Sequence, residues 1–345
     1  MEQFTRRNHY LPQLYLKSWS EDDKTVWQYQ LLVSNENVPV WKKTSIKEVA
    51  YHSDLYSGLL NGKETDEIEK FFQKEIEDPA KGAIVKVINH ERLAKSDLHS
   101  ITRFLAAQYV RTPARYFRHK PIYDRIVPSL LDKSLKKVVT EKEYAIANNL
   151  PKPNYGEGGK WLPYRSEILP SEKRDKSILK VEVLCDRQIW FIEIEKILNQ
   201  TYKCLLDNKW VFAEAATGVS FYTSDDPVIS AFFTNEDIKI GDGGWEVNGT
   251  KIIFPISPKI VMFTEVGKDF DENIVQKSPL FSFYMQKCTI AHAFRAIYSN
   301  TPSPYITTCR SRKIDNCQFN REKNELRNWH EKQSDAEATY RNNIK

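Results

Sequence analysis

Residues 96–113 read SDLHSITRFLAAQYVRTP and combine a helix start, an apolar stripe and a helix end. Ser96 offers a side-chain oxygen that can accept hydrogen bonds from the first amides of a helix. Apolar residues then recur at helical spacing, namely Leu98, Ile101, Phe104, Leu105 and Tyr109. Pro113 ends or kinks this helix, because the residue before a proline avoids helical dihedrals. The segment therefore predicts one amphipathic helix that carries polar residues.

Helical spacing extends to both sides of this segment. Residues 64–88 place apolar side chains on one face and Glu or Lys on the other. Residues 115–145 are helix-prone and rich in basic groups. Two further helices are expected, from Arg174 or Ile178 to Leu206 and from Leu280 to Ala296.

Short strands are expected before and after these helices. The candidates are β-branched or aromatic stretches bounded by Gly, Asp, Asn or Pro: Val26–Leu32, Val38–Trp41, His52–Tyr56, Trp210–Glu214, Ser220–Thr223, Gly244–Val247, Ile252–Ile256 and Val261–Thr264. Ile297–Ser299 is expected to complete the core. Strands that alternate with helices in this irregular way favour an α+β fold of short antiparallel strands and packed helices in a single compact unit.

The domain organisation follows from the same pattern. We expect a single α+β domain over residues 1–310, with a loop-rich insertion at about 146–172 where prolines and glycines gather. Residues 311–345 are alternately charged and have few apolar anchors, so they predict an exposed charged helix or tail.

Composition excludes several classes of protein. The hydrophobic fraction of 41% and the aromatic fraction of 12% can supply a core, which excludes a disordered chain. The apolar stretches are too short to span a membrane. Met1–His9 is polar and charged, which predicts no secretory signal, and the five cysteines form no CxxC pair. These features predict a cytoplasmic protein. A net charge of +5 allows contact with nucleic acid but is weak evidence for it.

Familiar catalytic motifs are absent from the sequence. It contains no GxGxxG, GxSxG or HExxH pattern. Asp226 and the later Asp237-Ile238-Lys239 imitate the acid and acid-x-Lys arrangement of metal-dependent nucleases. A chain with 28% charged residues produces such patterns often by chance.

The first polar cluster lies in Asn8–Leu16. His9 and Gln13 are four residues apart across Pro12, so they can point the same way. Histidine titrates near neutrality and suits acid–base catalysis. The structural alternative is a histidine that satisfies buried backbone groups.

The second cluster lies on the helix that ends at Pro113. Gln108 and Arg111 share a helix face, and Arg103 can join it from two turns away. Guanidinium groups bind phosphate or carboxylate in a bidentate manner. The structural alternative is an ion pair with an acid on the preceding helix, such as Glu69 or Glu75.

The third and fourth clusters follow predicted strands. Ser224 and Asp225 lie in an acidic, hydroxyl-rich turn that could bind a metal, act as a base or cap a loop. Phe254–Pro258 reads as a strand that ends in a rigid turn, which favours architecture over chemistry.

In this order the four segments resemble a bacterial family known as domain of unknown function 4238. The matching stretches are His9–Leu16, Gln108–Pro113, Thr223–Val228 and Pro255–Pro258, with Ile256 where the family has leucine. The resemblance implies that His9, Gln13, Gln108, Arg111 and Asp225 form one site. It also implies that Glu69 and Glu75 lie on the family's glutamate-bearing helix, and it favours a nuclease or toxin-like effector in bacterial defence.

Two hypotheses of function follow. In the first, the protein is a phosphodiesterase that acts on RNA or DNA. Its catalytic residues would be His9, Gln13 and Asp225; Gln108, Arg111, Arg103 and Ser224 would bind substrate; and Glu75 with Asp225 would hold a divalent metal such as Mg²⁺. The basic segment 115–137 could follow a phosphate backbone. In the second, it is a non-enzymatic ligand- or partner-binding module whose polar cluster is structural. No membrane partner is expected in either case.

Overall fold

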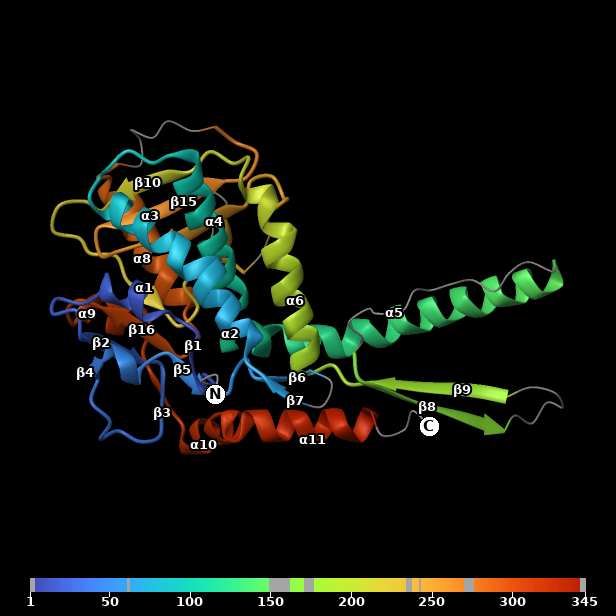
Figure 1. Cartoon of the computed structure of the whole chain (residues 1–345). Helices are drawn as coiled ribbons and strands as arrows, with labels where there is room; N and C mark the ends of the chain where they lie inside the picture. The colour runs from blue at the N-terminus through green and yellow to red at the C-terminus, as the bar shows by residue number, and fades with distance from the viewer. Residues whose placement is uncertain are drawn as a thin grey trace. The chain divides into compact units, whose positions relative to one another are not determined.

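The chain divides into two compact units (Figure 1). Unit 1 is Met1–Arg115 with Ile194–His330, and unit 2 is Tyr116–Glu193 with Glu331–Lys345. The computed structural model describes residues 4–60, 63–148, 162–170, 177–233, 238–241, 243–269 and 276–341.

Small antiparallel sheets and helices alternate along the chain, which confirms the predicted α+β class. The single domain over 1–310 and the separate segment 311–345 stay a prediction, because compact units are not the same as independently folding domains.

The larger sheet of unit 1 has five antiparallel strands in the order β10-β15-β14-β12-β13. They are Val211–Glu214, Ile260–Glu265, Lys251–Pro255, Ile229–Phe233 and Ile238–Ile240. Phe254 pairs with Met262, and Ile253 pairs with Phe263. Because side chains alternate between the two faces of a strand, Phe254 and Phe263 project from opposite faces.

Helices cover both faces of this sheet. The ring of Phe254 stacks on Tyr15 of α1 (Gln13–Lys17) at 5.4 Å and lies 6.1 Å from Phe104 of α4 (Lys95–Val110). On the other face, Phe263 meets Phe281 of α8 (Pro279–His292) edge-on at 5.3 Å. All three contacts join aromatic rings at ordinary packing distances. The first polar motif is thus fixed to the core through Tyr15.

The second sheet of unit 1 has four antiparallel strands in the order β11-β16-β2-β4. They are Thr223–Ser224, Ala296–Ser299, Thr25–Gln30 and Trp41–Ser45. Three smaller pairings join β1 with β5, β6 with β7 and, in parallel, β3 with β17. Their strands are Arg7–His9, Tyr51–Ser53, Gly58–Leu60, Lys63–Thr65, Leu32–Val33 and Lys313–Ile314.

The predicted helix over 64–88 is made of three successive pieces. These are α2 (Glu67–Phe71), a π-helical segment η2 (Phe72–Glu77) and α3 (Asp78–Ile88). The next helix, α4, begins at Lys95, and the Asp97 carboxylate accepts from the Ala94 amide at 2.8 Å. Asp97 therefore supports the helix start that was assigned to Ser96. The remaining helical pieces of unit 1 are η1 (Ile46–Glu48), η3 (Thr201–Leu205), α9 (Pro304–Cys309) and α10 (Asn316–Leu326).

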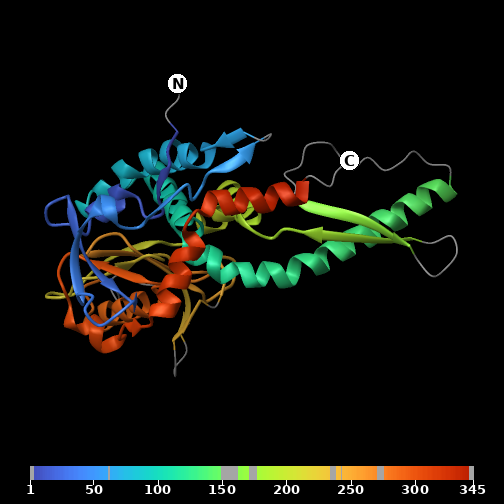
Figure 2. The ribbon, with the colours of Figure 1, turned by 90° about the horizontal axis from the view of Figure 1, so that it is seen from below.

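Unit 2 contains most of α5 (Pro113–Ala147), the hairpin of β8 (Tyr164–Pro170) and β9 (Ser177–Val183), the start of α6 (Arg187–Asn199) and most of α11 (Trp329–Arg341). In Figures 1 and 2, α5 and the hairpin extend in the same direction. Within this unit, Arg187 and Glu337 form an ion pair whose side chains are both buried.

Two predictions in this region are wrong. The insertion at 146–172 contains the strand β8, and the helix expected from Arg174 or Ile178 begins only at Arg187. Leu179, Val181 and Val183 alternate with charged residues, so the period is two and the segment is a strand. Residues 149–161 and 171–176 lie outside the described residues.

The expected exposed tail is also partly wrong. It is helical, but Trp329 is buried, as is Glu337, because their faces of α11 pack inward. Gly244–Val247 forms a turn where a strand was expected. Among the described residues, no helix has the length and apolarity that crossing a membrane requires.

Candidate functional site

The first polar motif begins on β1 and continues into α1. The His9 side chain is half-buried, and its Nε2 lies 3.3 Å from Nε2 of Gln13, so the two residues face each other as the spacing predicted. Burial, followed by the charges of Arg7 and Arg111, lowers the pKa of His9 to about 4. His9 is therefore neutral near pH 7 and can act as a base or an acceptor.

Arg111 caps the C-terminal end of α4 and is completely buried. Its Nη1 donates to Oε1 of Glu77 at 2.7 Å, and its Nη2 donates to the carbonyl of His9 at 2.6 Å. The guanidinium also lies 4.2 Å from the ring centre of Phe72. Burial tends to lower the pKa of Arg111, but Tyr56 and Glu77 outweigh it and raise the pKa above its ordinary value. The cation is held on several sides at once.

The acid that pairs with Arg111 is Glu77, whereas the sequence suggested Glu69 or Glu75. The π-helical segment η2 explains the difference. A π-helix closes i→i+5 bonds, so the 3.6-residue spacing of an ordinary helix does not continue through it. Glu75 is exposed, and its backbone carbonyl accepts from Nη1 of Arg103 at 3.1 Å. Arg103 is therefore tied to the π-helical backbone.

Glu69 lies in the same cluster without pairing directly with Arg111. Burial raises the pKa of Glu69 to about 7, although the positive charge of Arg111 opposes this shift. Its Oε2 is buried and has no hydrogen-bond partner among the described residues. Glu69 and His9 are thus both predominantly uncharged between pH 4 and 7.

Gln108 is fully buried one turn before Arg111. Neither its amide oxygen nor its amide nitrogen has a hydrogen-bond partner within the described part of the chain. Residues three and four apart on a helix are neighbours, so Gln108 lies between Phe104 and Arg111 on one stripe of α4. The amide is therefore positioned where α4 meets the first motif.

The third motif fastens β11 to the turn that follows α8. The two carboxylate oxygens of Asp225 accept from the amides of Phe294 and Arg295 at 2.8 and 2.6 Å. The amide of Asp225 donates to the carbonyl of Ala296 at 3.0 Å. Burial raises the pKa of Asp225 to about 6 in spite of these bonds. This arrangement matches the loop-capping alternative for Asp225.

The neighbouring Asp226 is buried and pairs with His292, which the sequence reading did not single out. Its Oδ2 lies 3.1 Å from Nε2 of His292, at the end of α8. Its Oδ1 is 3.5 Å from the Thr112 hydroxyl, which is long for a hydrogen bond. The hydroxyl of Ser224 donates to the Asp226 carbonyl at 2.8 Å. In the sequence, the one indication of the Asp226–His292 pair is that His292 lies near the end of the helix predicted over Leu280–Ala296.

The four motifs meet in unit 1. The His9 carbonyl binds Arg111, and the Tyr15 hydroxyl lies 2.7 Å from the Thr223 hydroxyl and donates to the Pro255 carbonyl at 2.6 Å. Two of these three bonds involve Tyr15, which was not assigned a role. In the fourth motif, the Ser257 hydroxyl accepts from the amides of Lys259 and Ile260, so this motif shapes a turn as expected.

The two residues predicted to hold a metal, Glu75 and Asp225, lie in different surroundings. The described part of the chain contains no group of three His, Cys, Asp or Glu side chains that could hold a metal ion. Glu75 is exposed, and Asp225 uses both oxygens on backbone amides. The metal-binding role of Glu75 and Asp225, like the catalytic and substrate-binding roles above, stays a prediction. Asp237 lies outside the described residues.

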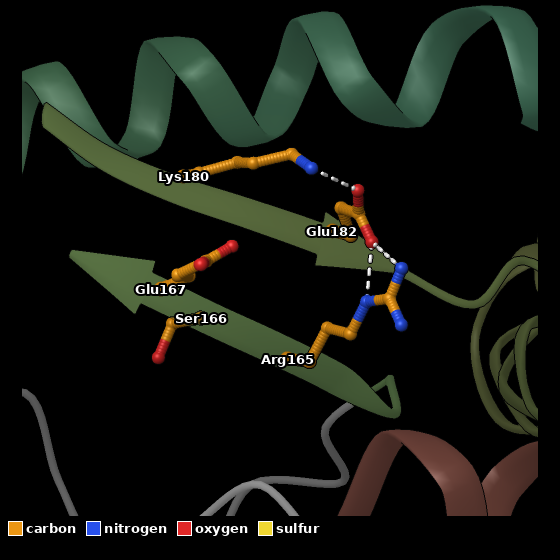
Figure 3. Close-up of a pocket in the computed structure, with 5 residues that line it drawn as sticks. All are labelled: Arg165, Ser166, Glu167, Lys180 and Glu182. Atoms are coloured by element: carbon orange, nitrogen blue, oxygen red, sulfur yellow. Dashed lines mark hydrogen bonds and ion pairs between the residues drawn. The ribbon is translucent and has the colours of Figure 1, made fainter. Parts of the chain in front are cut away.

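A separate pocket belongs to unit 2 and lies on the β8–β9 hairpin (Figure 3). It has a volume of about 410 Å³ and is lined by Arg165, Ser166, Glu167, Lys180 and Glu182. Glu182 pairs with both Lys180 and Arg165. This pocket was not predicted, because the segment was assigned to a loop and a helix.

The fold and the joined motifs define an α+β protein whose buried polar network links segments distant in sequence. The family model described as "Protein of unknown function (DUF4238)" matches residues 7–303, so the chain belongs to this family, as the motifs indicated. No curated protein and no solved structure matches the chain.

Proposed function

We propose that the protein is a non-enzymatic interaction module, in which the polar motifs fix the fold of unit 1 and unit 2 offers a surface to a partner. The observation that carries this proposal is the state of Arg111. Its side chain has no exposed surface, and its guanidinium is bound to Glu77 and to the carbonyl of His9. To bind a phosphate, Arg111 would first have to leave both partners.

Asp225, an acidic residue, supports the same proposal. A catalytic carboxylate must reach water or substrate, but both oxygens of Asp225 accept from backbone amides of one turn. Side chains that bind backbone groups in this way shape loops. Tyr15 extends the network to β11 and β14 through two more bonds. The motifs therefore act as cross-links among α1, α4 and both sheets.

Unit 2 supplies the surface for a partner. Of the fifteen large apolar side chains that are exposed in the described residues, nine lie on α5 or on the β8–β9 hairpin. On α5, Ile122, Ile126 and Leu130 follow one another at spacing four, which places them on one face. Exposed apolar groups gathered in this way mark interaction surfaces more often than isolated ones do.

The test compares a buried arginine with a half-buried one on the same helix. Arg111→Met should lower the free energy of unfolding by about 3–5 kcal/mol, because it leaves Glu77 without its cation. Arg103→Met is the matched control and should remain folded. Thermal unfolding and cleavage of total RNA and DNA would be measured for both. The proposal fails if the wild type cleaves a nucleic acid and Arg111→Met loses that cleavage while unfolding at the wild-type temperature.

A second candidate is the phosphodiesterase, a nuclease-like effector of bacterial defence. The pair Glu69 and His9 favours it, because environments that shift two titratable groups in this way can create an acid and a base. A protonated Glu69 could donate a proton and a neutral His9 could accept one, beside the positive charge of Arg111.

Its test is a pH profile of nucleic-acid cleavage with and without a chelator. Cleavage should be greatest between the two pKa values, about 4 and about 7, and should be lost in Glu69→Gln and in His9→Gln. Glu67→Gln, an exposed neighbour on α2, serves as the control. If purified wild type leaves RNA and DNA intact across this range in either condition, this candidate is abandoned.

A further inference from the structure

In the described part of the chain, the β8–β9 hairpin has an unpaired strand edge, although Arg165 lies over the Tyr340 ring of α11 at 5.3 Å. It forms a sheet of two strands, and no third strand joins it among the described residues. All residues of β8 except Leu169 are exposed, and Ile168 is 73% exposed. An isolated two-stranded hairpin is marginally stable in water, and a third strand or a covered apolar face is normally required. The outer edge of β8 is therefore a place where another strand can add.

The charges of the hairpin are unevenly satisfied. Glu182 takes two cations, with Lys180 at 2.8 Å and Arg165 also in contact, while Glu167 has no ion-pair partner within the described residues (Figure 3). Glu167 is exposed on the edge strand. If Arg165 moved to another carboxylate, Glu182 would keep Lys180. The Glu167 carboxylate is therefore available for an ion pair, and Arg165 can form one with a second copy.

The sequence of β8 is complementary to itself. Residues 164–168 read YRSEI, so an antiparallel copy with Ser166 opposite Ser166 places Arg165 opposite Glu167 twice. The same register places Tyr164 opposite Ile168 on the other face. Opposite charges and aromatic–β-branched pairs are the cross-strand pairs that stabilise antiparallel sheets.

We infer that two copies of this chain associate through the outer edges of β8, in antiparallel register about Ser166, to form a four-stranded sheet β9-β8-β8-β9. This inference rests on the proposed function, since it names the partner as a second copy. Pro163 and Pro170 stand at the two ends of the pairing segment, and no proline lies between them. The Pro163 carbonyl accepts from the Leu184 amide within the hairpin at 2.8 Å, so by alternation the backbone of residue 170 faces the outer edge. Because proline cannot donate to a ladder, the pairing ends at Pro170 and its register is limited.

The pairing also joins the apolar faces of the two hairpins side by side. Tyr164, Ile168, Leu179, Val181 and Val183 lie on one face of the hairpin, as the register of the two strands requires. Ile168 and Leu179 are more than half exposed in one copy. Joining two such faces gives a four-stranded sheet with a continuous apolar side, the condition that the single hairpin does not meet.

The experiment uses the full chain and measures mass by sedimentation equilibrium over a concentration series. The wild type should approach twice the mass of one chain. Glu167→Arg should weaken association at least about tenfold, because it sets two arginines opposite each other at both ends of the pairing. Arg165→Glu should weaken it for the corresponding reason. Mixed in equal amounts, the two variants should form a one-to-one heterodimer, since each arginine again meets a glutamate.

Two results would overturn the inference. One is a wild type that stays monomeric over the whole series. The other is a dimer that both single variants leave unchanged. Circular dichroism of each variant verifies that the chain is folded, so loss of association is not confused with loss of structure. If the wild type is monomeric, the edge of β8 would be available to a strand of a different protein. The proposed interaction module is tested separately by the Arg111→Met variant.

Discussion

Two buried arginines, one in each unit, are neutralised in different ways. Arg111 and Arg187 are both completely buried. Arg111 binds Glu77 with one nitrogen at 2.7 Å, and the Glu77 side chain keeps 19% of its surface exposed. Arg187 binds both oxygens of Glu337, at 2.7 and 3.2 Å, and the Glu337 side chain is 1% exposed. The Arg111–Glu77 pair is partly exposed to water and is called the open pair below. The Arg187–Glu337 pair is fully buried and is called the closed pair.

The difference separates an adjustable site from a structural clamp. Around Arg111, the pKa of Glu69 is raised and that of His9 is lowered, so small changes of pH alter the charge of the cluster. Arg187 also donates to the Ser334 hydroxyl at 3.0 Å, and its amide donates to Gln333. These bonds fasten the start of α6 to α11. A bidentate, buried pair of this kind fixes geometry and has little remaining capacity to bind a ligand.

The largest effect is expected from breaking the closed pair. Glu337→Ala leaves the guanidinium of Arg187 buried without a counter-ion, which should cost about 3–5 kcal/mol of unfolding free energy. Hydrogen exchange should rise first in α6 and α11. Glu331→Gln, which changes an exposed acid on the same helix, is the control and should change stability by less than about 0.5 kcal/mol.

A double variant sharpens that result. Arg187→Met with Glu337→Leu removes both charges and fills the space with apolar groups, so most of the lost stability should return. If Glu337→Ala unfolds like the wild type, the pair does not hold α11, and the contrast between the two arginines is wrong.

Breaking the open pair should cost less. Glu77→Gln keeps an oxygen that can accept from Arg111 but removes the negative charge, and Glu77 is partly hydrated. We expect a loss of about 2–3 kcal/mol by chemical denaturation. Glu75→Gln is the matched control two residues away on the same π-helical segment, where the side chain is exposed. Equal losses in the two variants would contradict the assignment of Glu77 as the partner.

The pH dependence of stability tests whether the open cluster is adjustable. The pKa of Glu69 is raised from 4.5 to about 7 on folding, so the folded state binds the proton more tightly and loses stability as pH rises through that window. The pKa of His9 is lowered from 6.5 to about 4, so its contribution is present above 6.5 and is lost as pH falls toward 4. The two slopes oppose each other.

Single variants should expose these opposed slopes. Relative to wild type, Glu69→Gln should gain about 3 kcal/mol between pH 4.5 and 7. His9→Gln should lose stability relative to wild type as the pH rises from about 4 to 6.5, because only the wild type gains stability from His9 over that range. Urea unfolding at half-unit pH steps measures both differences. Parallel curves for all three proteins would show that neither group changes its proton affinity on folding.

The fold could be predicted where the sequence has a clear period. Residues 96–113 gave α4 and its end, because one apolar stripe and a proline set both features. The hairpin was missed because Ile178 and Leu179 are adjacent apolar residues that fit a helix as well as a strand. The burial of Glu337 was missed because a charged helix shows its partner only in three dimensions.

The site could be predicted as a set of motifs but not as a network. The pairing of His9 with Gln13 follows from local spacing across Pro12. Glu77 could not be identified as the partner of Arg111, since no sequence pattern predicted the π-helical segment in which Glu77 is the last residue. Tyr15 and His292 bind residues about 70 to 240 positions away, and spacing carries no information about such contacts.

The smallest loss of unfolding free energy is expected when Arg103 is replaced, and this residue serves as the reference for the buried arginines. It lies on α4, which Arg111 caps, but is half-buried. Among the described residues, its guanidinium contacts one carbonyl at 3.1 Å and two rings more than 5 Å away. Arg103→Met keeps the apolar stem and removes a charge that water already hydrates in part. The expected loss is below about 1 kcal/mol in urea unfolding. A loss as large as that of Arg111→Met would mean that position on α4, rather than burial of the charge, determines the cost.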